Sequence, residues 1–185
     1  MSPKSTIYKV ELQVSDMDRN YYQAHNLTLA LHPSETEQRM MARLLAFAVN
    51  ADELLAFGRG LSTEDEPDLW LKDRTGEIDL WIEVGQPDEQ RIRRACGRAR
   101  RVIVYNYSGR SAQVWWDKTG PALARNKNLS VIDLPAEACM AMAAMAERGM
   151  RLQCMIQDGQ VQLMNDAVTV TIAPAPRLAA ANHAR

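Results

Sequence analysis

The chain has 185 residues, of which 46% are hydrophobic and 24% are charged, and its net charge is −1 at pH 7. These values are ordinary for one globular domain and give no overall positive field, so any contact with nucleic acid must use a local surface. No apolar run approaches the ~20 residues of a membrane span, and the N-terminus lacks a signal-peptide core. The three cysteines lack metal-ligand spacing. We therefore expect a cytoplasmic protein with no membrane partner and no zinc site.

An antiparallel hairpin is predicted at the N-terminus, followed by a long helix. Residues 7–14 alternate between polar and apolar side chains, and a second strand follows at 21–32. Ser34 is the expected N-cap of the helix, with Glu37 as its capping-box partner. Apolar residues then recur at helical spacing, and we expect the helix to extend to near Gly58.

Residues 67–94 carry the most informative pattern: two alternating strands, a tight turn and then a helix. A two-residue turn at Thr75 and Gly76, with the glycine supplying a positive φ, places Asp68 opposite Glu83. Their Cβ atoms would lie about 5 Å apart on one face of the hairpin. Two carboxylates this close repel each other unless a cation or a proton lies between them, so the spacing points to a divalent metal.

The same register places Lys72 opposite Asp79, and two interpretations stay open. The first is a cross-strand ion pair worth roughly 0.2–1 kcal/mol, which we favour. In the second, Asp79 is a third metal-binding acid and Lys72 activates water. Asp68 and Glu83 also have a structural alternative, in which one is a surface acid and the other is neutralised by neighbouring arginines.

Strands and helices alternate after this hairpin. Pro87 begins a helix that ends near Arg98, and the continuous apolar run at 102–105 predicts a strand buried on both faces. Asp158 and Gly159 predict a type I′ turn between two strands. The other expected elements are a strand at 112–116, a short helix at 120–125, a strand at 129–134, a helix at 135–148 and strands at 152–157, 160–164 and 168–172.

Three arginines share one stripe of the helix that follows the hairpin. Arg91, Arg94 and Arg98 recur at i, i+3 and i+7. Guanidinium groups suit bidentate contacts with phosphate, so this stripe is the candidate nucleic-acid surface. The alternative is a solvated helix face that pairs with nearby acids.

The layout of the hairpin resembles that of the PD-(D/E)XK nucleases. Asp68 follows a proline, Glu83 lies fifteen residues later in Glu-Val-Gly, and a helix comes next. The resemblance implies that Asp68 and Glu83 hold Mg²⁺. It also implies a catalytic lysine, but that position holds Gly85, and the Gln86 amide that follows cannot act as a base near neutral pH.

Longer stretches resemble the bacterial YaeQ family over nearly the whole chain: SDMDRNYYQAHNLTLALHPSETEQRMMARLLAF, EDEPDLWLKD, WIEVGQPDEQRIRRACGRARRVIVY and QCMIQDGQV. The resemblance implies an α/β (α+β) fold of the restriction-endonuclease class and leaves the activity open. We expect one domain at 1–173, with a core of helix, hairpin, helix and strands at about 33–148. Terminal strands at 6–32 and 151–172 would form a small antiparallel lobe, followed by an unstructured tail at 174–185.

Two functional hypotheses follow from these residues. One is a metal-dependent, nuclease-like phosphodiesterase, divergent or inactive, with Mg²⁺ or Mn²⁺ as its cofactor. The other is a non-catalytic module that binds nucleic acid or a protein partner, which the missing lysine favours. The candidate residues are Asp68, Asp79 and Glu83 for the metal, Asp68, Glu83, Gln86 and Lys72 for catalysis, and Arg91, Arg94 and Arg98 for nucleic acid.

Overall fold

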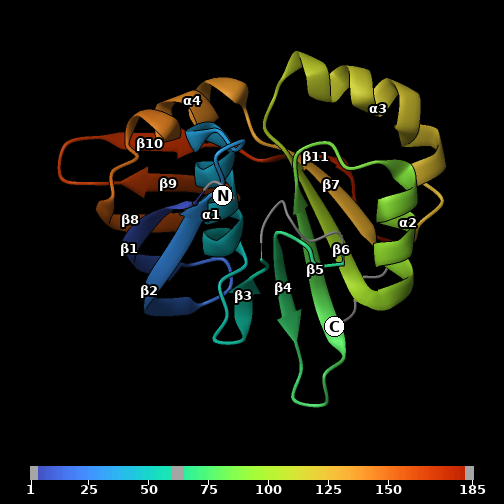
Figure 1. The fold of residues 1–185 in the computed structure, drawn as a ribbon, viewed down its shortest axis with the longest axis horizontal. Coiled ribbons are helices and arrows are strands. Elements are labelled where there is room, and N and C mark those ends of the chain that lie inside the picture. The colour runs from blue at the N-terminus through green and yellow to red at the C-terminus, as the bar shows by residue number, and fades with distance from the viewer. Residues whose placement is uncertain (1–3, 60–64, 182–185) are drawn as a thin grey trace. The chain divides into compact units, whose positions relative to one another are not determined.

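The computed structural model describes residues 4–59 and 65–181, and over these residues it contains four helices and two sheets (Figure 1). This confirms the mixed α/β class. The chain divides into two compact units: the first comprises Met1–Ala51 and Pro135–Pro174, and the second Asp52–Leu134 and Ala175–Arg185. In the described part of the chain, no helix is long and apolar enough to cross a membrane.

The first unit contains a five-stranded sheet in the order β10-β9-β8-β1-β2. The N- and C-terminal strands meet in this sheet as expected, but β1 and β8 run parallel, so the prediction of a purely antiparallel lobe was wrong. The turn through Asp158 and Gly159 is confirmed, with both residues at positive φ. The strands are β1 (Thr6–Asp16), β2 (Tyr21–Leu31), β8 (Gly149–Gln157), β9 (Gln160–Met164) and β10 (Thr169–Ile172).

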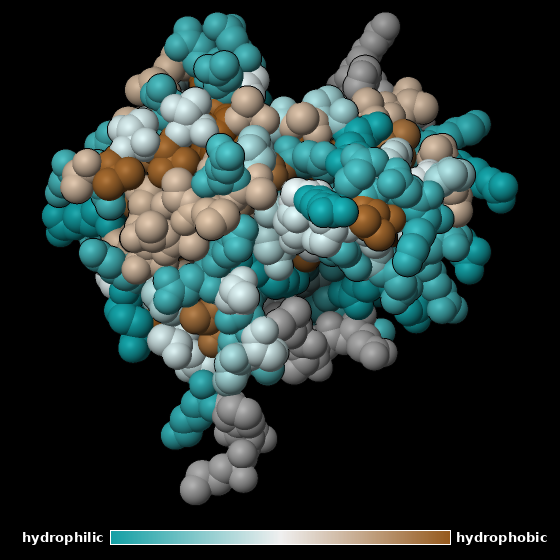
Figure 2. All heavy atoms as spheres, turned by 90° about the horizontal axis from the view of Figure 1, so that it is seen from above, coloured by the Kyte–Doolittle hydropathy of each residue, from teal (hydrophilic) through white to brown (hydrophobic). Residues whose placement is uncertain are grey.

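Two helices complete the first unit and contact each other, α1 (Glu37–Val49) and α4 (Ala136–Ala144). The expected N-cap was wrong: Thr36 caps α1 by accepting a hydrogen bond from the Arg39 amide at 3.1 Å, whereas Ser34 bonds His32. Helix α4 is apolar on its outer side as well as its inner side. Its Met140 is 63% exposed, and the surface over α4 is tan and brown at the left of Figure 2.

The second unit contains a six-stranded sheet in the order β11-β7-β6-β5-β4-β3, in which β5, β6 and β7 are parallel. Helices α2 (Glu89–Arg98) and α3 (Arg110–Leu123) cover one face of this sheet (Figure 1). Trp81, Ile92 and Trp115 are buried together in the core beneath them. The strands are β3 (Leu55–Phe57), β4 (Leu69–Lys72), β5 (Ile78–Val84), β6 (Ala99–Asn106), β7 (Leu129–Asp133) and β11 (Ala175–Leu178).

Three elements of the second unit differ from the sequence-based prediction. The first helix ends at Val49, and Leu55–Phe57, expected to continue it, is strand β3, because β4 offers it a hydrogen-bonding edge. The expected strand at 112–116 and helix at 120–125 are instead one helix, α3, which buries Ala112, Trp115 and Leu123. Part of the expected tail forms β11, which pairs with β7.

The central hairpin keeps the predicted register near its base and loses it near its tip. Leu69 lies opposite Ile82, as the pattern requires, but a bulge pairs Lys72 with Ile78 instead of Asp79. The bulge arises because the turn is longer than two residues: the Asp73 amide donates to the Glu77 carbonyl, and the Asp73 carbonyl accepts from Gly76. Gly76 has the expected positive φ, here in a turn that adds one residue to β5.

Candidate functional site

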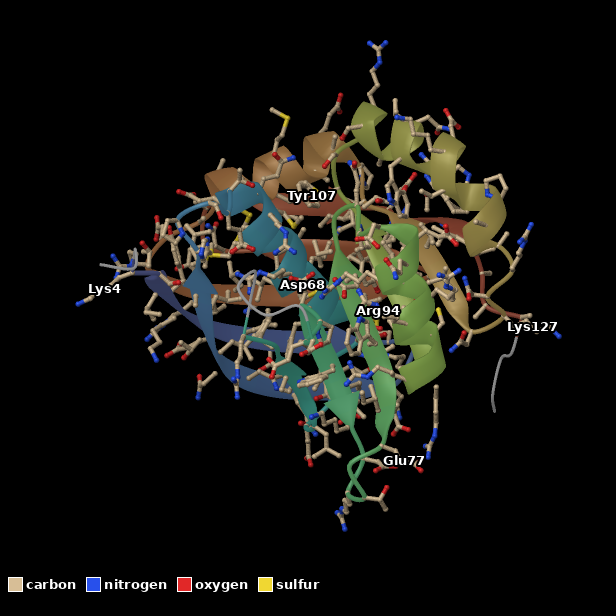
Figure 3. All side chains as sticks on the ribbon, turned by 45° about the vertical axis from the view of Figure 1, so that its right-hand side comes forward. Lys4, Asp68, Glu77, Arg94, Tyr107 and Lys127 are labelled. Atoms are coloured by element: carbon tan, nitrogen blue, oxygen red, sulfur yellow. The ribbon has the colours of Figure 1, made fainter. Side chains whose placement is uncertain are left out.

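Asp68 and Glu83 are neighbouring buried carboxylates at the base of the β4–β5 hairpin. The ladder ends with Leu69 opposite Ile82; Asp68 directly precedes β4, and Glu83 follows Ile82 on β5. The two residues are 6% and 4% exposed, and Asp68 Oδ2 accepts a hydrogen bond from the Val84 amide at 2.8 Å. Figure 3 shows Asp68 at one end of the hairpin and Glu77 at the opposite tip. The aliphatic alternation therefore brings the two acids together.

Glu83 is hydrogen-bonded by two neighbours on the helix-covered side of the sheet. Its Oε1 accepts from Trp81 Nε1 at 2.9 Å and from Arg91 Nε at 2.8 Å. Arg91 is fixed in turn, since its backbone amide donates to the Asp88 N-cap and its Nη2 donates to the Glu66 carbonyl at 2.9 Å. The sequence left open that a neighbouring arginine neutralises Glu83, and Arg91 forms such an ion pair.

The buried position of Glu83 disfavours its charged form. Burial raises the pKa of Glu83 above its ordinary value, and repulsion from Asp68 raises it further. Arg91 and the Trp81 hydrogen bond act in the opposite direction, but their combined effect is smaller. The surroundings of Glu83 therefore favour its protonated form over the free carboxylate.

The backbone that follows Glu83 requires glycine. Gly85 has a φ of +109°, and its amide donates to the Tyr105 carbonyl at 2.8 Å. A Cβ there would have room, with Tyr107 Cε1 as its nearest neighbour at 3.8 Å, but side chains are strained at this φ. Gln86 Nε2 donates to Ser111 Oγ at 2.8 Å, which ties the β5–α2 connection to α3. The lysine position of the nuclease layout is thus closed to lysine by backbone conformation.

Lys72 and Asp79 lie away from the acidic pair. Lys72 Nζ is 3.7 Å from the centre of the Trp70 ring, and Asp79 pairs with Arg100 near the hairpin tip. The ion pair that we favoured between Lys72 and Asp79 is therefore absent, because the bulge separates them. Among the described residues, no group of three or more His, Cys, Asp or Glu side chains is arranged to hold a metal ion. The structure brings together two of the three candidate metal ligands.

The three arginines of the stripe on α2 have different surroundings. Arg91 is held by Glu83, whereas Arg98 lies 5.1 Å from the centre of the Trp81 ring and donates to the Asp65 carbonyl at 3.2 Å. Arg94, labelled on α2 in Figure 3, is exposed. Only part of the stripe is therefore a solvated surface that a phosphate could reach without displacing other contacts.

Sequence reasoning missed Asn106 and Asp133, which end β6 and β7 at the same edge of the parallel sheet. Asn106 Nδ2 donates to Asp133 Oδ1 at 3.3 Å, and its buried Oδ1 has no hydrogen-bond partner in the described part of the chain. Arg177 approaches Asp133 to 2.6 Å, as an ion pair without the alignment of a hydrogen bond. The sequence feature that could have pointed to this pair is Asn106, a polar residue directly after the apolar run 102–105.

These features define a mixed α/β protein with a buried pair of carboxylates next to the first turn of a helix. The family profile described as YaeQ protein matches residues 1–174, and the chain belongs to the YaeQ family. It is 48% identical over 166 residues to a protein of Escherichia coli K12 named "Uncharacterized protein YaeQ", covering 90% of this chain and 92% of that protein. The Salmonella typhi protein of the same name is 49% identical over 163 residues, covering 88% and 90%.

Two crystal structures of YaeQ proteins have the same fold. The structure from Xanthomonas axonopodis pv. citri is 54% identical with a TM-score of 0.91, covering 95% of this chain and 99% of that chain. The structure from Pseudomonas syringae is 38% identical, also with a TM-score of 0.91, covering 96% and 98%.

Proposed function

We propose that Asp68 and Glu83 bind a divalent cation of the Mg²⁺ or Mn²⁺ type, and that the protein is a divergent phosphodiesterase on a restriction-endonuclease-like scaffold. The observation that carries this proposal is the pair of neighbouring buried carboxylates at the base of the β4–β5 hairpin. Repulsion from Asp68, which contributes to the raised pKa of Glu83, supports it. Carboxylate oxygens are the ligands that Mg²⁺ and Mn²⁺ prefer.

The residues of the pocket fit such an ion in their chemistry. Asp68 would contribute a carboxylate already oriented by the Val84 amide, and Glu83 one oriented by Trp81. A bound cation would polarise a phosphoryl oxygen. It would also lower the pKa of a water molecule bound to it, so that hydroxide could form near neutral pH. If the cation replaced Arg91 as the partner of Glu83, the guanidinium of Arg91 would be released to pair with a phosphate oxygen. Asp79 stays outside this proposal, because Arg100 holds it.

Calorimetric titration with Mn²⁺ and Mg²⁺ tests the cation site. We expect the wild type to bind with a measurable heat, and Asp68→Asn and Glu83→Gln to bind at least about tenfold more weakly, since each removes one charged ligand. Asp79→Asn is the matched control: it removes an acid from the same hairpin and should bind like the wild type. Equal heats from all four proteins, or none from any, would overturn the proposal.

Hydrolysis is a separate measurement. We expect cation-dependent cleavage of single- or double-stranded DNA or RNA by the wild type and its loss in Glu83→Gln. Cation binding without cleavage of any of these would retain the cation site and reject the phosphodiesterase.

A second candidate function, a non-catalytic nucleic-acid-binding module, is favoured by the positive φ of Gly85, which excludes the usual lysine. Its contact surface would include Arg94 and Arg98 on α2. Phosphate contacts predict an affinity that falls steeply with salt, and Arg94→Ala with Arg98→Ala should reduce that slope by about 2. Arg125→Ala, an exposed arginine beyond the end of α3, is the control. An unchanged slope in the double variant would reject this surface.

A further inference from the structure

Strand β2 forms one edge of the sheet in the first unit, and it is long for an edge strand and has no bulge, charge or proline. All eleven of its residues pair with β1 in continuous register without a bulge. Its sequence, YYQAHNLTLAL, contains no Lys, Arg, Asp, Glu, Pro or Gly. Proteins usually protect an edge with charges, prolines, bulges or a short strand, because the outward amides and carbonyls can pair with another strand.

The other three sheet edges in the described part of the chain have such protection. β3 is three residues long, and β10 is four residues long and ends just before Pro174. β11 is also four residues long, contains Pro176 and shifts its register against β7. The lack of protection is therefore specific to β2.

We propose that the edge of β2 pairs in antiparallel register with β2 of a second copy of this chain, so that two five-stranded sheets form one continuous sheet across a two-fold axis. Arg43 Nη2 already donates to the outward carbonyl of Ala30 at 3.0 Å, so the overlap covers residues 23–29, and its centre places the axis at Asn26. Ala24 then lies opposite Thr28 of the partner subunit. Alternate residues direct their amide and carbonyl groups outward, so each strand satisfies the other.

The composition of β2 fits a second copy better than a charged peptide. Six of its residues are exposed, and those on the solvent face are Tyr22, Ala24, Asn26, Thr28 and Ala30. Pairing this strand with itself brings no like charges together, which would otherwise oppose a symmetric ladder. A charged partner would find no complementary charge on the strand. The pairing does not depend on the proposed cation site, which belongs to the other unit.

Sedimentation velocity over a wide range of protein concentration tests the dimer. We expect the wild type to change from monomer to dimer as its concentration rises. Asn26→Lys places two ammonium groups at the axis and should raise the dissociation constant about tenfold or more. Gln13→Lys adds the same charge to the same exposed face on the interior strand β1 and should leave it unchanged. A wild type that remains monomeric throughout, or equal effects of the two lysines, would overturn the proposal.

Cross-linking tests the register. Directly opposed residues of an antiparallel pair have Cα atoms about 4.5–5.5 Å apart, which suits a disulfide. Asn26→Cys should therefore form a covalent dimer under mild oxidation, whereas Gln13→Cys and the wild type should not. Cys139 and Cys154 are buried, and burial raises the pKa of the half-buried Cys96 to about 11.

Hydrogen exchange distinguishes pairing with a second copy from coverage of the β2 edge by another part of the same chain. The outward amides of β2 should gain protection as the protein concentration rises. Protection that is independent of concentration would mean that another part of the same chain covers the edge, and it would overturn the dimer.

Discussion

The carboxyl group of Glu83 accepts hydrogen bonds from Trp81 and Arg91, and its pKa is nevertheless raised. Burial is the main cause, and the charge of Asp68 adds to it. Arg91 therefore does not offset the effect of burial on Glu83. Under the cation proposal made above, a proton and a divalent cation compete for this carboxylate.

This competition predicts how the stability of the protein depends on pH. Because the pKa of Glu83 is raised above its ordinary value of 4.5, the folded state keeps the Glu83 proton to a higher pH than the unfolded chain does. The contribution of this group is therefore most favourable below about pH 4.5 and is lost as the pH rises through the folded-state pKa. Glu83→Gln, which cannot ionise, should gain stability relative to the wild type as the pH rises from 4.5 towards 7.

Urea unfolding of both proteins at several pH values, in EDTA, measures this difference. Asp133→Asn is the control, since it removes an acid elsewhere in the same unit. A difference between wild type and Glu83→Gln that stays constant with pH, or that changes in the opposite direction, would contradict the prediction. Added Mn²⁺ should remove the advantage of the variant, because the cation stabilises the ionised pair of the wild type.

At the scale of secondary-structure elements, the connection between β5 and α2 determines how the acidic pair is presented. It places Arg91 in the first turn of α2, three residues after the Asp88 N-cap. Gly85 makes this connection possible through its positive φ. A lysine at this position would therefore need a different backbone conformation.

Gly85→Ala should destabilise the protein by about 1–3 kcal/mol, because the backbone conformation at this position strains any side chain. Gly97→Ala is the matched control. Gly97 lies in α2 without a positive φ, and a Cβ there meets no atom within 4 Å. That change should stabilise the protein by about 0.5–1 kcal/mol. Denaturant unfolding measures both, and equal effects of the two substitutions would show that φ at Gly85 is not limiting.

At the scale of the whole molecule, each unit is assembled from separated parts of the chain. The second unit takes its last strand, β11, from beyond residue 174, after the chain has completed the first unit. Strand β11 pairs with β7, and its Arg177 contacts Asp133. The C-terminal segment therefore contributes to the fold of a unit that begins at residue 52.

Truncation after Pro174 should lower the free energy of unfolding of the second unit by about 1–3 kcal/mol, since it removes ladder hydrogen bonds and one ion pair. Amides of β7 should also exchange faster with solvent. Arg177→Gln, which removes the partly exposed ion pair with Asp133 and the exposed hydrogen bond to Gln113, should cost less than the truncation. A truncated protein with the same stability and the same β7 protection as the full chain would contradict this prediction.

The sequence determined those features that depend on neighbouring residues. Alternation of aliphatic side chains predicted the register at the base of the hairpin, where Leu69 lies opposite Ile82, although the structure buries Asp68 and Glu83 as well as the aliphatic face. That register was sufficient to predict the pairing of Asp68 with Glu83. Asp158 and Gly159 likewise determined the β8–β9 turn, since both tolerate positive φ.

The tertiary structure decided the features that depend on a partner distant in sequence. Leu55–Phe57 and Ala175–Leu178 became strands because β4 and β7 offered them free edges, and no local pattern records such an edge. The longer turn at the hairpin tip separated Lys72 from Asp79. The sequence shows that residue 83 is an acid, but it does not show which residue pairs with it. The packing of α2 on the sheet decided that Arg91 forms the ion pair with Glu83, because the contact depends on the position of the helix.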